Sequence, residues 1–363
     1  MQGSRLKKIV FVHLLNDFSG SPKVLSQTME VADSLGFEVH LYTCSDGVGF
    51  LDNVKGKRFS FPYKRFTNKV LTLFSFLSSQ FILFLKLLKC RKDIDKVIYI
   101  NTMLPFGAAL AGKLMGKRVI FHIHETSLKP QIFKKILRLI IKVSASEIIF
   151  VSEYLRKIEV FDRTPSKVIY NGIAGQKYLP ESRKHGKGFS ILMICSLKAY
   201  KGVLGFVSLA REILKIKPDV RFTLILNASE TDIKRFFQDE VLPENLTVHA
   251  ELADVTSFYV DAALLLNLSN PDDCIETFGL TIVEGMSYGL PVIVPPVGGP
   301  SEIVRHDEQG YLIDSRDLDE LIVKVCYLID HPSEYDRLSA NAFNRAQDFS
   351  LEVFGQKIED LLI

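Results

Sequence analysis

At 363 residues, the chain is longer than one hydrophobic core usually supports, so we expect two domains. Its composition, 47% hydrophobic and 24% charged, is that of a globular protein and excludes global disorder. The net charge of +3 conceals two halves of opposite sign. Residues 1–180 contain 28 Lys and Arg and 13 Asp and Glu, so this half is basic. Residues 181–363 contain 17 Lys and Arg and 29 Asp and Glu, so this half is acidic.

Short β-branched segments alternate with longer helical patterns along the first half, which predicts a parallel sheet covered by helices. The apolar run after Lys7 and Lys8 lacks a small-residue cleavage pattern, so we interpret it as the first strand rather than a signal peptide. The predicted strands are 8–15, 38–43, 59–63, 96–101, 118–124, 147–151 and 167–170, and the predicted helices are 23–35, 70–85, 106–115 and 131–144.

Residues 70–85 form the most apolar of these helices, with no charge in 16 residues. A helix that spans a bilayer needs about 20 apolar residues, and this segment includes three serines, a threonine and a glutamine. We therefore predict a buried helix, or one that lies on a surface, rather than a spanning helix.

The alternating pattern restarts after residues 178–188, a polar segment with a proline and two glycines that we interpret as a linker. The strands predicted beyond it are 189–195, 220–226, 246–249, 262–267 and 291–294, with a helix at 203–216. The pattern thus predicts two consecutive doubly wound units. Such units bind ligands at the carboxyl ends of their strands.

The cysteines are odd in number, widely spaced and without a CxxC pair. This pattern argues against a disulfide framework or a zinc site and predicts reduced thiols in the cytoplasm. The five are Cys44, Cys90, Cys195, Cys274 and Cys326.

Residues 272–304 hold the side chains best suited to chemistry. Glu276 and Glu284 are separated by seven residues, with Phe278, Gly279 and Leu280 between them. A helix that begins near Gly279 would direct its first N–H groups and its positive dipole end at a phosphate. Glu284 can then accept hydrogen bonds from a ribose diol, and Glu276 from sugar hydroxyls. The alternative is two solvated glutamates beside an ordinary helix, which the neighbouring glycines at 289, 298 and 299 disfavour.

The stretch ETFGLTIVEGMSYGLPVI, followed by GGPSEIV, resembles the signature of glycosyltransferase family 4, and the similarity covers most of the chain. The resemblance implies the GT-B fold, an α/β architecture of two Rossmann-like doubly wound domains facing across a cleft. It also implies sugar transfer from a nucleotide donor with retention at the anomeric carbon. In such a site Glu276 contacts the donor sugar, Glu284 the nucleotide ribose, and the backbone after Phe278 the donor phosphate and sugar oxygens.

Lys201, which precedes a glycine after the first strand of the second half, resembles the family's diphosphate-binding lysine. Its charge would neutralise the leaving nucleotide diphosphate; the alternative is a solvated loop lysine. Family members usually carry an arginine a few residues earlier, where this chain has Ser196 and then Lys198. We expect both to border the diphosphate, although a lysine lacks the bidentate fork of an arginine.

The segment VIFHIHE ends a predicted strand, and His122 and His124 point to the same face of it. The family's pairing of a histidine with an acidic residue favours His124 with Glu125 and leaves His122 structural. The resemblance implies that His124 hydrogen-bonds the donor sugar near its reacting carbon. A His-x-His pair can also bind a metal, but no third ligand is evident, so we expect no metal and no cofactor.

Two turns complete the site that the resemblance implies. The loop 16–21 after the first strand corresponds to a glycine-rich family loop near the donor phosphates or the acceptor, which implies a role for Gly20. It contains no GxGxxG fingerprint, so a nicotinamide-dependent dehydrogenase is disfavoured. Asn171 and Gly172 resemble the family's turn at the domain crossover, where Asn171 either borders the cleft or belongs to a plain turn.

Residues 131–142 place Lys134, Lys135, Arg138 and Lys142 among apolar residues at helical spacing. A basic amphipathic helix of this kind can lie on an anionic bilayer, or it can be a surface helix packed on the sheet, and both readings stay open. A bilayer would suit a lipid-linked acceptor. Nucleic acid is not expected as a partner, because the basic half lacks an interleaved aromatic platform.

We predict an acceptor-binding domain at 1–177, a nucleotide-sugar-binding domain at 178–345, and a C-terminal helix at 346–363 that crosses back to the first domain. The predicted protein is a retaining hexosyltransferase acting on a lipid-linked, lipopolysaccharide or capsule glycan, cytoplasmic and peripheral on the inner face of the membrane. The alternatives are a nucleotide-sugar epimerase or hydrolase of the same fold, and a non-catalytic nucleotide-sugar-binding module.

Overall fold

The computed structural model describes residues 7–91, 97–126, 128–176, 188–252, 254–273 and 275–363. Its contacts divide the chain into two compact units, Met1–Gly172 with Leu351–Ile363 (unit 1) and Ile173–Ser350 (unit 2). The predicted boundary at 177/178, most of the predicted linker 178–188 and Cys274 lie outside the described residues.

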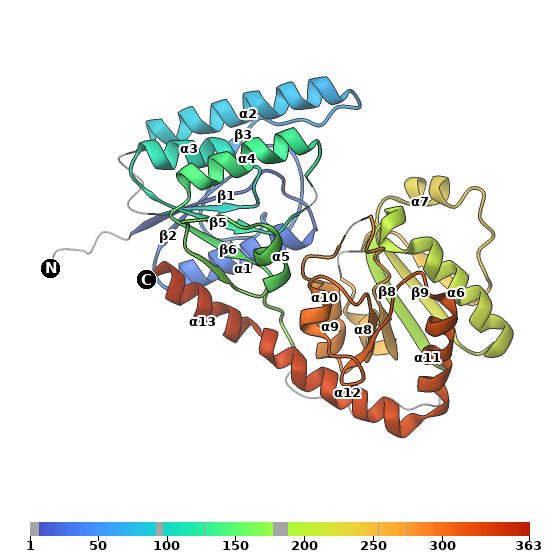
Figure 1. Ribbon diagram of the computed structural model, residues 1–363. Helices are drawn as coiled ribbons and strands as arrows, with labels where there is room; N and C mark the ends of the chain where they lie inside the picture. The colour runs from blue at the N-terminus through green and yellow to red at the C-terminus, as the bar shows by residue number, and fades with distance from the viewer. Residues whose placement is uncertain (1–6, 92–96, 127, 177–187, 253, 274) are drawn as a thin grey trace. The chain divides into compact units, whose positions relative to one another are not determined.

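Unit 1 is built on a seven-stranded parallel sheet (Figure 1). In spatial order its strands are β3 (Lys57–Phe61), β2 (Glu38–Cys44), β1 (Lys8–Val12), β4 (Val97–Asn101), β5 (Arg118–Ile123), β6 (Glu147–Phe150) and β7 (Ser166–Val168). The register is fixed at the centre, where Val12 of β1 pairs with Tyr42 of β2 and with Ile100 of β4. The central strands are buried along their length, as expected for a parallel sheet with both faces covered.

Helices cover both faces of this sheet (Figure 1). They are α1 (Gly20–Ser34), α2 (Lys69–Lys89), α3 (Phe106–Leu114), α4 (Gln131–Ser144), α5 (Glu153–Ile158) and α13 (Leu351–Leu362). On one face α3 lies between α2 and α4, and on the other face α1 packs against α13. The amide side chain of Asn68 caps α2 by accepting from the Val70 N–H at 2.8 Å, so this helix is longer than the predicted 70–85.

Unit 2 is built on a six-stranded parallel sheet (Figure 1). In spatial order its strands are β10 (Leu246–His249), β9 (Arg221–Asn227), β8 (Ser190–Ser196), β11 (Leu264–Leu266), β12 (Val292–Val294) and β13 (Gly310–Leu312). The helical segments are η2 (Ala199–Lys201), α6 (Val203–Ile216), α7 (Glu230–Phe236), α8 (Thr256–Asp261), α9 (Leu280–Ser287), α10 (Pro300–Ile303), α11 (Leu318–Asp330), α12 (Pro332–Ala346) and η3 (Gln347–Phe349).

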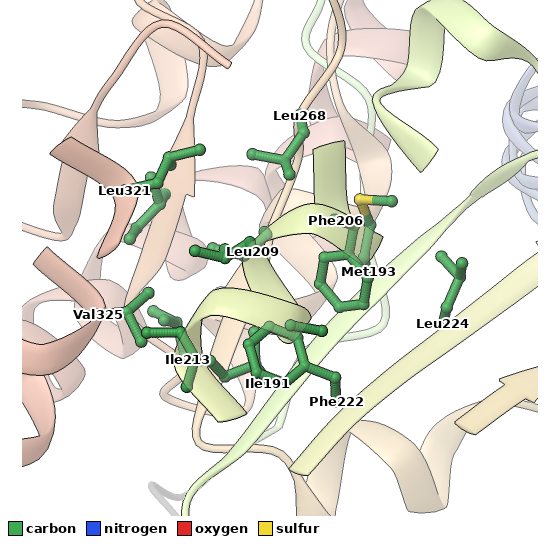
Figure 2. Packing of buried hydrophobic residues seen from close by; sticks show 14 of the residues in the cluster. Ile191, Met193, Phe206, Leu209, Ile213, Phe222, Leu224, Leu268, Leu321 and Val325 are labelled. Carbon is green, nitrogen blue, oxygen red and sulfur yellow. The ribbon is translucent and has the colours of Figure 1, made fainter. Parts of the chain in front are cut away.

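The core of unit 2 lies between the sheet and the helices α6 and α11. Figure 2 shows Phe206 and Leu209 of α6 lying over Ile191 and Phe222 of the sheet, and the rings of Phe206 and Phe222 meet edge to face at 5.2 Å. Burial of these apolar side chains fixes α6 on the sheet, and with it the turn η2 that precedes α6.

Both sheets follow the strand order 3-2-1-4-5-6 when each is counted from its own first strand, and unit 1 adds a seventh strand. That order defines the Rossmann fold and creates a ligand-binding crevice where the order reverses. The order reverses between β1 and β4 in unit 1 and between β8 and β11 in unit 2, so we expect ligands beyond the carboxyl ends of these strands. The predicted α/β fold of two Rossmann-like domains is confirmed.

The chain passes between the units twice, at Gly172–Ile173 and at Ser350–Leu351. Ile173 donates its N–H to the carbonyl of Phe349 at 2.9 Å and forms a parallel bridge with Ser350, so the two passages run side by side. The predicted helix at 346–363 is interrupted here, because α12 ends at Ala346 and α13 begins only at Leu351.

Candidate active site

The turn after β8 carries an ion pair at the switch point of unit 2. Lys201 Nζ lies 2.6 Å from Glu276 Oε2, and both side chains are about one-fifth exposed. Lys201 is placed by the short η2 turn, and Glu276 by the loop after β11, which the Asn270 N–H ties to the Tyr200 carbonyl at 2.7 Å. Two residues 75 positions apart in the sequence are thereby brought together.

The end of β8 lies beside this pair. Cys195 lies near the end of β8, and burial raises the pKa of its thiol to about 12, while the charges of Lys201 and Glu276 act on it in opposite directions. Ser196 ends β8, and its carbonyl accepts from the Lys198 N–H at 2.8 Å. The Lys198 side chain is exposed. The predicted diphosphate residues therefore share one turn, and Lys201 is the one in the ion pair.

Helix α9 begins immediately after this loop, with its N-terminus lacking a side-chain cap among the described residues. Gly279 is the N-cap residue and has a φ of 108°, a conformation that favours glycine. Phe278 is buried and meets the ring of Phe349 at 5.9 Å, which anchors the turn, and Leu280 is the first helical residue. The first N–H groups of α9 and its positive dipole end can therefore serve an anion.

A second loop, which contains Gly298 and Gly299, packs against the backbone of Glu276. The Gly299 N–H donates to the Glu276 carbonyl at 2.9 Å. A Cβ atom on Gly298 would lie 2.4 Å from that carbonyl oxygen, and one on Gly299 would lie 2.4 Å from the Phe278 Cα. Only glycine allows the two loops to approach this closely, so the GGP sequence determines where the Glu276 backbone lies.

Glu284 projects from the middle of α9 and accepts a hydrogen bond from the Tyr259 hydroxyl at 2.8 Å. Tyr259 belongs to α8, and its ring stacks on Tyr288 with centroids 5.4 Å apart. Burial raises the pKa of Tyr259 well above its usual value, and the Glu284 charge adds to the shift, so the phenol stays protonated and donates. Tyr259 was not predicted from the sequence, because it lies 25 residues from Glu284 and no motif marks it.

Unit 1 carries a second polar cluster at its switch point. His124 follows β5, and its Nε2 lies 2.8 Å from Asn101 Oδ1 at the end of β4. Asn101 Nδ2 donates to the Ser21 carbonyl at 3.0 Å, which fixes the amide so that Oδ1 faces the imidazole. The Nε2 of His124 is then the donor. Burial lowers the pKa of His124 well below its usual value, with neighbouring His122 and His13 adding to the effect, so the ring is neutral.

Glu125, beside His124, is the acidic partner that the sequence predicted. Its Oε1 accepts from the Met103 N–H at 2.7 Å, and burial raises the pKa of its carboxyl to about 7. His122 is fully buried, with Nδ1 2.8 Å from the Tyr99 hydroxyl, and burial lowers its pKa to about 3. The structural role predicted for His122 agrees with this burial.

Two further predicted residues also lie in unit 1. Gly20 is the first residue of α1 and adjoins Ser21, whose carbonyl meets Asn101. Asn171 is buried after β7, and the next residue, Gly172, packs against Phe354 of α13. The structure therefore groups Gly20 with His124 in unit 1. It groups Ser196, Lys198, Lys201, Glu276, Phe278, Gly279, Leu280 and Glu284 in unit 2.

Among the residues that the structure describes, no three His, Cys, Asp or Glu side chains are grouped to hold a metal ion. The absence of a metal and of a cofactor stays a prediction.

Two family models match consecutive parts of the chain. "Glycosyltransferase Family 4" matches residues 18–176, and "Glycosyl transferases group 1" matches residues 176–345. A trehalose synthase of Pyrococcus horikoshii is 27% identical over 209 residues, which is 54% of this chain and 43% of the relative. A sucrose synthase of Denitrovibrio acetiphilus is 39% identical over 77 residues, 20% of this chain and 10% of the relative. The chain thus spans less than half the length of these curated relatives.

Solved structures resemble the whole chain. HepE from Anabaena, solved with UDP and glucose and also with UDP-glucose, superimposes with a TM-score of 0.79 at 20% identity, covering 98% of this chain and 99% of that chain. The lipopolysaccharide outer core galactosyltransferase WaaB superimposes with a TM-score of 0.70 at 17% identity, covering 97% and 98%. At these identities the likeness establishes a shared fold.

Proposed function

Because the chain belongs to the family 4 glycosyltransferases of the GT-B fold, we propose that it transfers a sugar from a nucleotide diphosphate sugar to a hydroxyl acceptor, with retention. The observation that carries this proposal is the Lys201–Glu276 ion pair at the carboxyl end of β8, beside the N-terminus of α9. A cation and a helix N-terminus suit a diphosphate, and carboxylates suit the hydroxyls of ribose and sugar.

Each of the site residues in unit 2 then contacts a particular part of the donor. The first N–H groups of α9, after Gly279, hold the phosphate oxygens, and Lys201 neutralises the charge that develops on the leaving diphosphate. Glu284, kept in place by the Tyr259 hydroxyl, accepts the ribose hydroxyls. Glu276 accepts sugar hydroxyls on the side away from Lys201.

In the proposed reaction, the bond between the anomeric carbon and the diphosphate oxygen breaks, and the electron pair leaves with the nucleotide diphosphate. The acceptor oxygen forms the new bond to the same face of the anomeric carbon. The acceptor proton passes to the departing diphosphate oxygen. His124, neutral and protonated on Nε2, supplies a rigid polar group in unit 1 for the donor sugar rather than a nucleophile.

We further propose that the acceptor is a lipid-linked or surface-polysaccharide glycan at the inner face of the cytoplasmic membrane. The basic first half of the sequence supports this acceptor. The likeness to WaaB, an enzyme of the lipopolysaccharide outer core, is in keeping with it. HepE, solved with UDP-glucose, makes a UDP-sugar the first donor to test.

The test is nucleotide release from a panel of UDP-, GDP-, ADP- and CMP-sugars, with and without membrane lipid extract, for the wild type and for Glu276→Gln. Glu230→Gln, the same chemical change at an exposed site on α7, is the matched control. We expect release from one donor, stimulated by extract, in the wild type and in Glu230→Gln, and release lowered on the order of 100-fold in Glu276→Gln. Retention is read from the anomeric configuration of the product by NMR.

Other outcomes separate the alternatives. Donor consumption without dependence on any acceptor would favour an epimerase or hydrolase of this fold. Donor binding that Glu276→Gln weakens, without turnover under any condition, would favour a binding module. No binding and no consumption of any donor would reject the proposed site.

A further inference from the structure

Helix α2 exposes a continuous apolar row to solvent. Val70, Phe74, Leu77, Phe81 and Leu85 recur at intervals of three and four residues, so they share one side of the helix. Val70 is 74% exposed, Phe74 71% and Phe81 63%. Soluble proteins rarely expose a contiguous row of large apolar side chains, and such a row indicates an interaction surface.

The opposite side of α2 is packed within unit 1. Phe76, Leu83 and Leu87 are buried there, and Phe76 meets the rings of Phe106 in α3 and Phe133 in α4. The Gly107 N–H donates to Gln80 Oε1 at 3.1 Å. Among the described helices, α2 alone is long and apolar enough to cross a bilayer. A crossing would break these contacts and leave Gln80 in hydrocarbon, so α2 is suited to lie along a bilayer instead.

Helix α4 extends the same surface. Ile132, Ile136, Leu139 and Val143 form a second exposed row at intervals of three and four residues, with Ile132 65% and Leu139 61% exposed. Helix α3 lies between α2 and α4 and contacts both, and the ring of Phe76 reaches that of Phe133, so the three helices form one layer over the sheet. We call the two rows together the α2–α4 face.

The charged side chains that α2, α3 and α4 themselves carry are all positive. Lys134 and Arg138 pair with the buried carboxylate of Glu159, so these two bases hold α4 in the fold. Lys135 and Lys142 are exposed beside the α4 row. Lys69, Lys86 and Lys89 stand near the ends of α2. No Asp or Glu occurs in α2, α3 or α4.

We propose that the α2–α4 face docks on an anionic lipid bilayer, with Phe74 and Phe81 entering the interface and Lys135 and Lys142 meeting lipid phosphates. The apolar rows supply burial, and the exposed bases supply attraction to a negative surface. A second copy of the chain is a poor occupant, because its own α2–α4 face would bring like charges together. This inference deepens the proposed membrane acceptor, and its test measures lipid binding, so it can fail independently of the transferase proposal.

The chain contains no tryptophan, which allows a direct readout. Phe74→Trp and Phe81→Trp each place a single indole on the α2–α4 face, and Val323→Trp places one on the exposed side of α11 in unit 2. The full-length variants are titrated with phosphatidylcholine vesicles and with vesicles that also contain phosphatidylglycerol. We expect the emission of the two α2 indoles to shift to the blue with the anionic vesicles, and brominated lipid to quench it. The Val323→Trp emission should not change.

Substitutions separate the contribution of apolar burial from that of the lysine charges to vesicle binding. Phe74→Ser with Phe81→Ser should lower the partition coefficient for anionic vesicles on the order of 100-fold, whereas Val241→Ser with Val323→Ser, at exposed sites of unit 2, should leave it unchanged. Lys135→Gln with Lys142→Gln should lower it roughly 30-fold. Lys215→Gln with Lys234→Gln changes the net charge equally at exposed sites of unit 2 and should have little effect.

Four results would overturn the proposal. The wild type could fail to bind anionic vesicles, or the Val323→Trp emission could shift as much as that of the α2 variants. Without lipid, a concentration-dependent dimer that Phe74→Ser with Phe81→Ser abolishes would show that a second copy covers the face. Retention of the protein in membranes after alkaline carbonate extraction would show that α2 spans the bilayer.

Discussion

The carboxylates of Glu276 and Glu284 each accept from a donor in a distant part of unit 2. Lys201 reaches Glu276 from the β8 turn, and Tyr259 reaches Glu284 from α8. A glutamate side chain loses considerable rotamer freedom when a ligand orders it. Because these two are already held, that loss is smaller when hydroxyls bind, which is the advantage of a preorganised site.

Tyr259→Phe removes the hydroxyl that donates to Glu284 and keeps the ring. We expect the Kd for the nucleoside diphosphate of the active donor to rise roughly tenfold, because a hydrogen bond to a charged group contributes about 1.5 kcal/mol. Isothermal titration calorimetry measures the change. Tyr288→Phe, which alters the stacked neighbour and leaves the Tyr259 hydroxyl in place, is the control. Equal affinity in wild type and Tyr259→Phe would show that Glu284 does not depend on this donor.

Glu125→Gln tests the carboxyl next to His124 in unit 1. Its pKa is raised from 4.5 to about 7, so its neutral form is favoured in the folded state. This preference adds up to about 3 kcal/mol to the free energy of unfolding. The addition is complete below about pH 4.5 and is lost as the pH rises through about 7. Glutamine keeps an oxygen for the Met103 N–H and cannot ionise. In urea unfolding, the stability of Glu125→Gln relative to the wild type should therefore increase between about pH 5 and about pH 8. A constant difference would contradict the shift.

At the scale of elements, the site depends on the loop with Glu276 and the loop with Gly298 and Gly299. Their backbones approach each other too closely for a side chain to fit between them. Gly298→Ala and Gly36→Ala form a matched pair, since their φ angles are 77° and 79°. A Cβ on Gly36 meets nothing within 4 Å, whereas one on Gly298 would lie 2.4 Å from the Glu276 carbonyl oxygen. Both variants carry the conformational cost, about 1 kcal/mol. Only Gly298→Ala should also lower the affinity for the nucleotide sugar, because it displaces Glu276.

Isothermal titration calorimetry measures the donor affinity of both glycine variants, and a thermal melt measures their stability. If both variants lose stability equally and both keep donor affinity, the GGP loop does not position Glu276.

How well the sequence predicted an element depended on its length and pattern. The helices Gln131–Ser144 and Val203–Ile216 have the predicted bounds, because their apolar periodicity extends over several turns. The strand Gly310–Leu312 was missed, since it has three residues and begins with glycine. Within the site, the family signature indicated Lys201 and Glu276 but not their contact, which depends on how the β8 turn and the β11 loop meet in space. The contact of Tyr259 with Glu284 had no sequence signal for the same reason.

At the scale of the whole molecule, the histidines with lowered pKa among the described residues all lie in unit 1. Burial lowers the pKa of His13 to about 4 and of His122 to about 3, and these rings must gain a proton if unit 1 unfolds in acid. Their neutral forms stabilise unit 1 above about pH 6.5, and this stability is lost as the pH falls toward 4 and 3. Protonation of Glu125 offsets part of the loss.

We therefore expect unit 1 to lose on the order of 3 kcal/mol by about pH 4 and to unfold at a lower temperature than unit 2 in calorimetric scans. Hydrogen exchange resolved by peptide assigns each transition to its unit. A single transition whose midpoint depends equally on pH in peptides from both units would contradict this expectation.

Unit 1 is assembled from two stretches of chain that are separated by the whole of unit 2. On a ribosome, the residues up to Gly172 emerge well before α13 has been translated, and unit 2 can be completed in the interval. Until then the side of α1 around Val31, which later meets Gly355, lacks its covering helix, and Phe354, Ile358 and Leu361 have not yet been made. During synthesis there is thus a stage at which unit 2 can be complete while unit 1 still exposes the side of α1 that α13 later covers.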